Sequence, residues 1–177
     1  MDKLRFIKTR EVKSPCRAHA DDAGVDFFVP SDIKYEEFEN SSDKYQKNAV
    51  RIWHDDDGNI EKIFLEPGQS VNIPSGIKLK IPTGHALIFF NKSGVGMKKQ
   101  LDVLACVVDE SYQNEVHINL VNNGDLTQEI NAGEKIVQGV VLPVNYCIPE
   151  EAKDVDDLYN GVVTSRGQGG FGSSGTK

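Results

Sequence analysis

Cysteine is scarce in this chain, with only Cys16, Cys106 and Cys147 among 177 residues. The three lie far apart and their number is odd, so neither a disulfide framework nor a paired zinc site is expected. We interpret them as free thiols in a reducing compartment. Cys106 lies inside an apolar run and is predicted to be a core residue.

Long hydrophobic runs are also missing. The longest uninterrupted apolar stretch, residues 103–108, is far short of the roughly 20 residues that a membrane-spanning helix needs. The first six residues are charged and lack the apolar segment of a secretory signal. We therefore expect no membrane contact and a cytoplasmic protein.

Basic residues are in deficit, since 20 Lys and Arg face 27 Asp and Glu, for a formal net charge of -7. This balance disfavours nucleic acid as a partner, because nucleic acid is itself polyanionic. The acidic excess is concentrated in residues 31–66. The remainder is near neutral, which leaves room for a local basic site that holds an anion.

Short apolar or alternating segments separated by Gly, Pro, Asn and Asp predict an all-β fold. Only residues 96–100 are expected to form a helical turn. Many short strands at close spacing indicate a sandwich, a jelly roll or a barrel. The main predicted strands are residues 71–73, 77–81, 86–90, 101–108, 116–121 and 136–144.

Two segments depart from this pattern. Residues 35–63 are a polar insertion that ends in a predicted hairpin, with strands at 49–54 and 60–65 around an acidic turn. Residues 166–177 contain five glycines and cannot pack a core, so we expect a mobile arm there. The predicted organisation is a domain of residues 1–165 followed by this arm.

Asp109 is the first candidate for chemistry. It ends the apolar run 103–108 and precedes a tight connection that contains Tyr112. A carboxylate at the end of a buried strand is rigidly held and expected to be partly desolvated, which suits a general base that positions a water. The alternative is an Asp that caps a turn.

Lys92, Ser93 and Gly94 directly follow a predicted strand and offer a cation, a hydroxyl and exposed backbone amides. These groups suit a phosphate site, although the P-loop order is absent and an ordinary loop is the alternative. The tail places Arg166 and Phe171 in glycine-rich backbone, which suits a lid over a planar base. A disordered linker or an RNA-binding tail is the alternative there.

These segments follow one another in the order of the five motifs of the dUTPase family. The chain resembles that family along nearly its whole length, apart from residues 35–63. The matching segments are Ala23-Gly24-Val25-Asp26-Phe27, Lys92-Ser93-Gly94, residues 107–116, residues 133–138 and the glycine-rich tail from Arg166.

The resemblance implies a dUTPase-like distorted jelly roll of the β-clip type, with a flexible Gly-rich C-terminal arm. It implies a homotrimer whose active sites are shared between subunits. The implied activity is hydrolysis of dUTP to dUMP and pyrophosphate, which limits uracil incorporation into DNA and supplies dUMP for dTMP synthesis.

The resemblance also implies roles around the base and sugar. Asp109 would activate the water that attacks the α-phosphorus. Val107, Val108 and His117 would recognise the uracil edge through backbone groups, as an extended backbone presents a donor and an acceptor. Tyr112 would stack against deoxyribose and exclude a 2′-hydroxyl.

A second set of roles concerns the triphosphate. Lys92, Ser93 and Gly94 would hold the phosphates, while Gln138 and Asp26 would contact phosphate or the hydrated metal. Mg²⁺ would be held mainly by the triphosphate and water, with Asp26 acting through water.

In the arm, Arg166 would reach the γ-phosphate and Phe171, beside Gly172, would cover the uracil.

The sequence departs from the usual family pattern at several positions. Lys92 replaces an Arg and cannot make a bidentate contact with phosphate. Asn114 replaces a Gly but tolerates left-handed backbone. Val25 replaces an aromatic residue and Ser111 an Asp, and none of these changes removes Asp109.

The insertion and the activity each have an alternative interpretation. Residues 35–63 form either a solvated hairpin or an acidic surface for a protein partner, with Trp53 and Tyr45 as anchors. Some viral members carry extra segments here. A dCTP deaminase on the same fold would need a catalytic Glu, for which Glu115 is the nearby candidate. A regulator that binds a partner through 35–63 is the other rival.

Overall fold

The computed structural model describes residues 3–39, 50–167 and 169–170, and the chain divides into two compact units, residues 1–145 and 146–177. The predicted arm begins later, at Arg166. The predicted boundary between residues 165 and 166 therefore stays a prediction.

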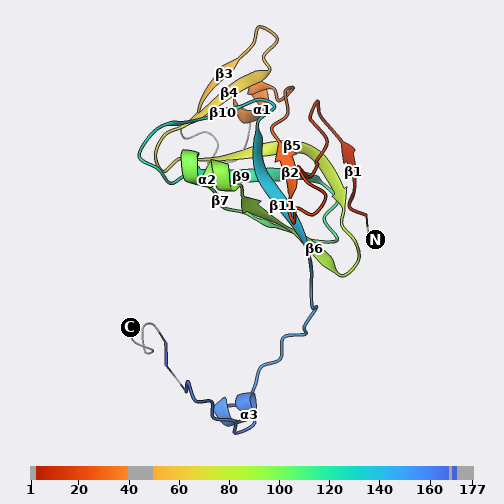
Figure 1. Cartoon of the computed structure of the whole chain (residues 1–177), viewed down its shortest axis with the longest axis vertical. Helices are drawn as coiled ribbons and strands as arrows, with labels where there is room; N and C mark the ends of the chain where they lie inside the picture. The colour runs from red at the N-terminus through yellow and green to blue at the C-terminus, as the bar shows by residue number, and fades with distance from the viewer. Residues whose placement is uncertain (1–2, 40–49, 168, 171–177) are drawn as a thin grey trace. The chain divides into compact units, whose positions relative to one another are not determined.

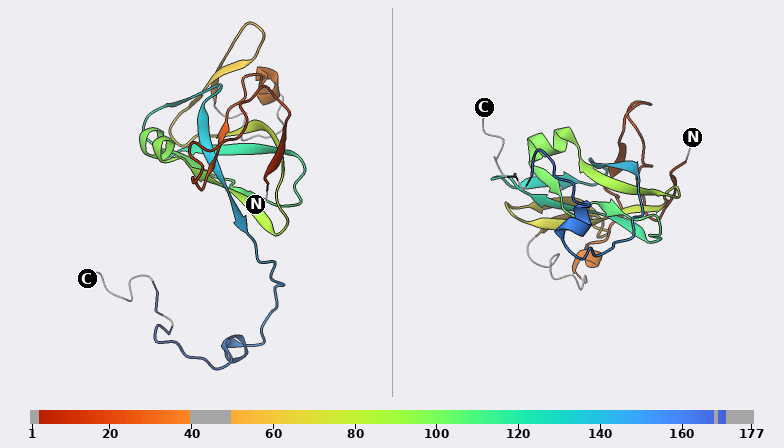
Figure 2. Two further views of the ribbon diagram at one scale, coloured as in Figure 1. Left: turned by 45° about the vertical axis from the view of Figure 1, so that its right-hand side comes forward. Right: turned by 90° about the horizontal axis from the view of Figure 1, so that it is seen from below.

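The first unit contains three antiparallel sheets, which confirms the predicted all-β class. The helices among its described residues are α1 (Tyr35–Glu39) and α2 (Ser93–Lys99). Figures 1 and 2 show the β3–β4 hairpin projecting from one end of this unit, opposite the end of β11. The sheets are, in spatial order, β1 (Arg5–Lys8), β5 (Ser70–Lys80), β9 (Glu115–Asn122) and β7 (Leu101–Val103); β2 (Val25–Phe28), β11 (Lys135–Pro143), β6 (His85–Asn91) and β8 (Val107–Val108); and β10 (Gln128–Asn131), β4 (Ile60–Leu65) and β3 (Arg51–His54).

One hydrophobic core joins the three sheets. In β9 the alternation is regular: Val116, Ile118 and Leu120 are buried, while His117 faces the other side. Phe27 of β2 and Phe89 of β6 meet edge to face, with ring centroids 5.0 Å apart. Such a pair adds about 1 kcal/mol beyond the area it buries. Cys106 packs against this core as predicted, and all three cysteines are free.

Two strand predictions were wrong because pairing partners override the local pattern. Residues 71–73 and 77–81 form a single strand, β5, which continues past Pro74 with a shift of register against β9. Gly76 takes φ +71° at this irregularity, a conformation that favours glycine. Residues 101–108 are two strands instead of one, since β7 pairs with β9 and β8 pairs with β6 in another sheet.

The insertion contains the predicted hairpin, observed as β3 and β4 around residues 55–59. The Asp55 carboxylate accepts a hydrogen bond from the Asn59 amide at 2.8 Å, which closes the turn. Tyr45 lies outside the described residues. The helix predicted at 96–100 begins earlier, at Ser93.

The second unit holds α3 (Val155–Tyr159), which the Asp154 carboxylate caps by accepting from the Asp157 amide at 2.9 Å. Within the described part of the chain, no helix has the length and apolar character needed to cross a membrane.

Candidate active site

A cavity of about 160 Å³ lies where β8 ends and β9 begins. The short strand β8 is fixed by pairing with β6, and the chain then turns at Asp109 and returns as β9. This geometry combines a carboxylate, a phenol and an imidazole with an apolar wall. The lining residues are Phe89, Ala105, Val107, Val108, Asp109, Tyr112, Val116 and His117.

The cavity brings together five residues predicted from the sequence, namely Val107, Val108, Asp109, Tyr112 and His117. Phe89, Ala105 and Val116 were not predicted from the sequence, because their apolar strand positions indicated only a core. Val116 carried a usable signal, because it lies in the same motif as Asp109.

The turn itself is held by groups other than the Asp109 carboxylate. The Tyr112 amide donates to the Asp109 carbonyl at 3.1 Å, and the Tyr112 hydroxyl donates to the Glu115 carbonyl at 3.0 Å. The Asn114 side chain accepts from the Glu115 amide at 2.9 Å. Among the described residues, no group hydrogen-bonds to the Asp109 carboxylate, so this side chain does not cap the turn.

The expected partial desolvation of Asp109 is not provided by the single chain, in which Asp109 is exposed. The strand beside it is also open, since Val107 is 62% exposed. The apolar run predicted to bury this carboxylate is split between two sheets and therefore does not enclose it.

His117 is oriented by Asn72. The imidazole Nδ1 lies 2.9 Å from Asn72 Nδ2, so Nδ1 accepts this hydrogen bond and Nε2 carries the proton. Burial lowers the pKa of His117; the negative charge of Glu115 opposes this effect and Arg10 adds to it. His117 therefore presents a neutral imidazole at the cavity.

A second group of predicted residues surrounds Asp26. This carboxylate is 5% exposed and forms ion pairs with Lys92 and with Lys135, the latter at 2.9 Å. Burial raises the pKa of Asp26, but hydrogen bonds and charge from Lys92 and Lys135 outweigh burial and hold it below its usual value. Gln138 pairs with Asp26 in the β2–β11 register and donates to the Asn91 carbonyl at 2.9 Å. Lys135 was not predicted, although it lies in the fourth motif.

Ser93 and Gly94 form the first turn of α2, with Lys92 as its extended N-cap residue. Amides in the first turn of a helix have no partner inside that helix. Both residues are exposed, and the space beside Gly94 is open, so these amides face solvent next to the Lys92–Asp26 pair.

The two groups lie at opposite ends of β6. Val108 pairs with Leu87, so Asp109 continues toward Ala86, whereas Lys92 follows the last residue of the strand. Six residues of strand, at about 3.3 Å each, separate these ends by roughly 20 Å. The Asp109 and Lys92 side chains of one chain therefore do not converge on one phosphorus atom.

The predicted arm residues belong to the second unit. Arg166 is exposed, and its Nε donates to the Gly169 carbonyl at 3.0 Å. Phe171 and Gly172 lie outside the described residues, so their predicted roles stay predictions.

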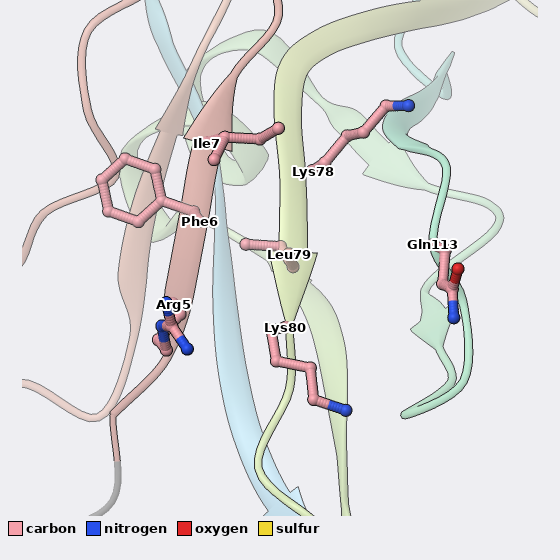
Figure 3. Close-up of a pocket in the computed structure, with 7 residues that line it drawn as sticks. All are labelled: Arg5, Phe6, Ile7, Lys78, Leu79, Lys80 and Gln113. Carbon is pink, nitrogen blue, oxygen red and sulfur yellow. The ribbon is translucent and has the colours of Figure 1, made fainter.

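A larger cavity, of about 350 Å³, is lined by the paired strands β1 and β5 and by Gln113 (Figure 3). Three cations surround an apolar floor, and no carboxylate, hydroxyl or imidazole lines it, so we assign it no chemistry. Its lining residues are Arg5, Phe6, Ile7, Lys78, Leu79, Lys80 and Gln113.

No cluster of three or more His, Cys, Asp or Glu side chains that could hold a metal exists among the described residues. Asp26 is the carboxylate nearest to the cationic group, and two lysines already neutralise it. Such a donor set suits an indirect contact through water better than direct coordination of Mg²⁺.

Comparison with known proteins gives a consistent result. The sequence model of the dUTPase family matches residues 60–175. A deoxyuridine 5'-triphosphate nucleotidohydrolase of Gloeothece citriformis is 36% identical over 75% of this chain and 93% of its own length. One from Corynebacterium jeikeium is 27% identical over 97% of this chain and 92% of its own length.

Solved structures show the same fold. A mutant dUTPase of Staphylococcus bacteriophage 80alpha with dUpNHpp aligns with a TM-score of 0.70 and 20% identity, covering 99% of this chain and 100% of that one. The dUTPase of phage phi11 of S. aureus aligns with a TM-score of 0.64 and 21% identity, covering 88% and 99%. The chain belongs to the dUTPase family.

Proposed function

We propose that this protein hydrolyses dUTP to dUMP and pyrophosphate. The observation that carries the proposal is the cavity in which Asp109, Tyr112 and His117 meet the end of β8. Family membership supports the same reaction, since the relatives are named as deoxyuridine 5'-triphosphate nucleotidohydrolases.

The cavity suits a uracil ring and its sugar. Phe89 and Val116 supply apolar surface, while the backbone of Val107 and Val108 supplies donors and acceptors for a base edge. Tyr112, at the mouth, packs against deoxyribose and leaves no space for a 2′-hydroxyl. This arrangement selects a deoxyribonucleotide by shape and the base by hydrogen bonds.

Asp109 is the general base of the reaction. Its carboxylate takes a proton from a water whose oxygen forms a bond to the α-phosphorus. The bond between that phosphorus and the oxygen bridging to the β-phosphate breaks, and pyrophosphate leaves with the electron pair. The proton on Asp109 is then released to solvent.

The complete site is shared between copies of the chain in a homotrimer. The two groups of one chain are roughly 20 Å apart along β6 by strand geometry, so Lys92, Ser93, Gly94 and Gln138 hold the phosphates of a nucleotide in a neighbour's cavity. Exposed apolar side chains in the second unit also support assembly, because such surfaces usually face a partner; they include Tyr146, Ile148, Val162 and Val163. Arg166, Phe171 and Gly172 then close the site.

Mg²⁺ is the metal that fits this site. It supplies charge neutralisation for the triphosphate oxygens, which together with water form its preferred ligands. Asp26 would contact the hydration shell of the bound ion through water. A solved phi11 relative is described with a structural Mg(II) ion, which supports use of the same metal here.

The insertion supports a second function, as a surface for a protein partner. Trp53 is 52% exposed on β3, packs edge to face on Phe64 with centroids 5.0 Å apart, and lies 5.5 Å from the Lys62 ammonium. A held, exposed aromatic residue beside the acidic turn 55–57 suits an anchor. The phi11 enzyme is described with a species-specific insert. Trp53→Ala that retains turnover but abolishes capture of a partner would separate this role from catalysis.

The reaction is tested by pyrophosphate release from dUTP, dCTP, dTTP and UTP with Mg²⁺, in wild type and Asp109→Asn. Turnover confined to dUTP and lost in the variant supports the proposal. Ammonia release from dCTP would favour the deaminase alternative. Folded wild type without dUTP turnover would exclude the enzyme and leave the partner-binding function.

A further inference from the structure

Arg10 joins two parts of the first unit that are far apart in sequence. Its Nε donates to Glu115 Oε1 at 2.9 Å, and its two terminal nitrogens donate to the Glu37 carboxylate at 2.9 and 2.6 Å. Glu37 lies in α1, inside the insertion, and also accepts from the Lys34 amide at 2.9 Å. One guanidinium therefore connects the insertion to the start of β9.

Glu115 transmits this contact to the cavity. The same Oε1 accepts from the Gly76 amide at 2.6 Å, and the Glu115 carbonyl accepts from the Tyr112 hydroxyl at 3.0 Å. Val116 and His117, which follow directly, both line the cavity. The position of the Glu115 backbone thus fixes Tyr112 on one side and His117 on the other.

The connection is geometrically specific, and its Arg10–Glu115 part is sheltered. The side chains of Arg10 and Glu115 are only 18% and 15% exposed, whereas Glu37 is 39% exposed and binds both ends of the Arg10 fork. Charge-assisted bidentate contacts of this kind are stronger than ordinary surface pairs. A lysine carries the same charge but has no fork with which to serve two carboxylates in fixed geometry.

We propose that Arg10 is a positioning residue for the nucleotide cavity, and that Glu37 makes the insertion part of its support. Arg10 holds Glu115, Glu115 holds Tyr112 and His117, and the base of the insertion holds Arg10. This role rests on the proposed function of the cavity. Because coupling between two sites is reciprocal, a ligand that orders the cavity also orders α1.

Amide hydrogen exchange of the full-length protein tests the positioning without relying on activity. In Arg10→Ala we expect exchange in residues 109–117 to accelerate about tenfold, and in Glu37→Gln about threefold, as the turn at 109–114 and the start of β9 open locally. The matched control is Lys62→Gln, which breaks the 3.0 Å pair with Glu129 in the insertion sheet and has no path to the cavity. It should leave 109–117 unchanged.

Kinetics then test the consequence for substrate. Arg10→Ala should raise KM for dUTP about tenfold with kcat within about twofold, because displacement of residues 112–117 weakens binding of the nucleotide more than it alters the Asp109 carboxylate. Arg10→Lys, which keeps one charged contact, should recover KM to within about threefold of wild type.

Several outcomes would overturn the proposal. Unchanged amide exchange at 109–117 in Arg10→Ala, or equal acceleration in every peptide, shows that Arg10 does not specifically stabilise residues 109–117. Faster exchange with unchanged KM shows that the hold does not matter to the nucleotide. Wild type without dUTP turnover rejects the proposed function instead. The exchange comparison still decides whether Arg10 positions residues 109–117.

Discussion

The cavity at Asp109 and the cationic group at Asp26 are built on opposite principles. The cavity is defined by strand edges, a tight turn and apolar side chains, and its carboxylate is left without a hydrogen-bond partner in the described chain. Around Asp26, a buried carboxylate is fully engaged by two lysines. Backbone geometry therefore defines one half of the site and balanced charge the other.

In the proposed site, the Asp109 cavity recognises the base and the group around Asp26 carries the cations that meet the triphosphate. A site that selects a base needs fixed donors and acceptors, which strands provide at little conformational cost. A site proposed to accept a triphosphate needs cations held in place, and the buried Asp26 carboxylate holds Lys92 and Lys135 in two ion pairs. Substitutions in the Asp109 cavity and around Asp26 should accordingly change different measured quantities.

The largest expected effect is at Asp109. Asp109→Asn should lower kcat about 10³-fold or more with little change in dUTP affinity, since it removes the general base and keeps the shape. Single-turnover kinetics and calorimetric binding of a non-hydrolysable dUTP analogue measure the two quantities. A comparable loss of affinity would mean that the carboxylate binds substrate instead of activating water.

The next effect concerns stability and lies in the other half of the site. Asp26→Asn should lower the free energy of unfolding by about 3 kcal/mol, because it leaves Lys92 and Lys135 without a counter-charge. The folded pKa of Asp26 lies below its unfolded value of about 3.9, so its stabilisation is present above that pH and is lost as pH falls through the folded value.

Urea denaturation from pH 7 to pH 2 measures this effect. The difference between wild type and Asp26→Asn should shrink on the acid side. A constant difference across the whole range would show that packing, not charge, stabilises this group.

Lys92→Arg should give a smaller, favourable effect. A guanidinium can hold Asp26 and present a second pair of donors to phosphate, so KM for dUTP should fall about threefold. Lys99→Arg is the control, since Lys99 lies on the same helix but pairs with Glu134. An equal fall in KM in both variants would show that the effect does not depend on the position of Lys92.

The smallest expected effect is the pH response of His117. Its lowered pKa keeps the imidazole neutral at pH 7 and down to a lower pH than an ordinary histidine. The acid limb of kcat/KM should therefore lie at a lower pH than an ordinary histidine would give, and Asn72→Ala should shift that limb by changing the ring's hydrogen bond. Titration of His117 by NMR checks the assignment.

Sequence patterns predicted the elements that depend on neighbouring residues. They did not predict the elements that depend on pairing with strands distant in sequence. Alternation and turn residues predicted β9 and the β3–β4 hairpin, because both depend on neighbouring residues. The bend of β5 at Gly76 and the division of residues 101–108 depend on strands distant in sequence, so no window of local pattern contains them. Five of the cavity residues, Val107, Val108, Asp109, Tyr112 and His117, lie close together in the sequence and were predicted together, whereas Phe89, Ala105 and Val116 were not. The network of Arg10, by contrast, joins positions as far apart as 10 and 115, and only the fold brings it together.

The separation along β6 has a genetic consequence. If each site takes Asp109 from one chain and Lys92 from another, two inactive alleles, Asp109→Asn and Lys92→Glu, complement each other when expressed together. Random mixing in equal amounts restores about a quarter of the sites, because each site draws its two halves independently. By the same logic an Asp109→Asn allele does not abolish activity in a mixed cell, and loss of function is proportional to dose instead of dominant.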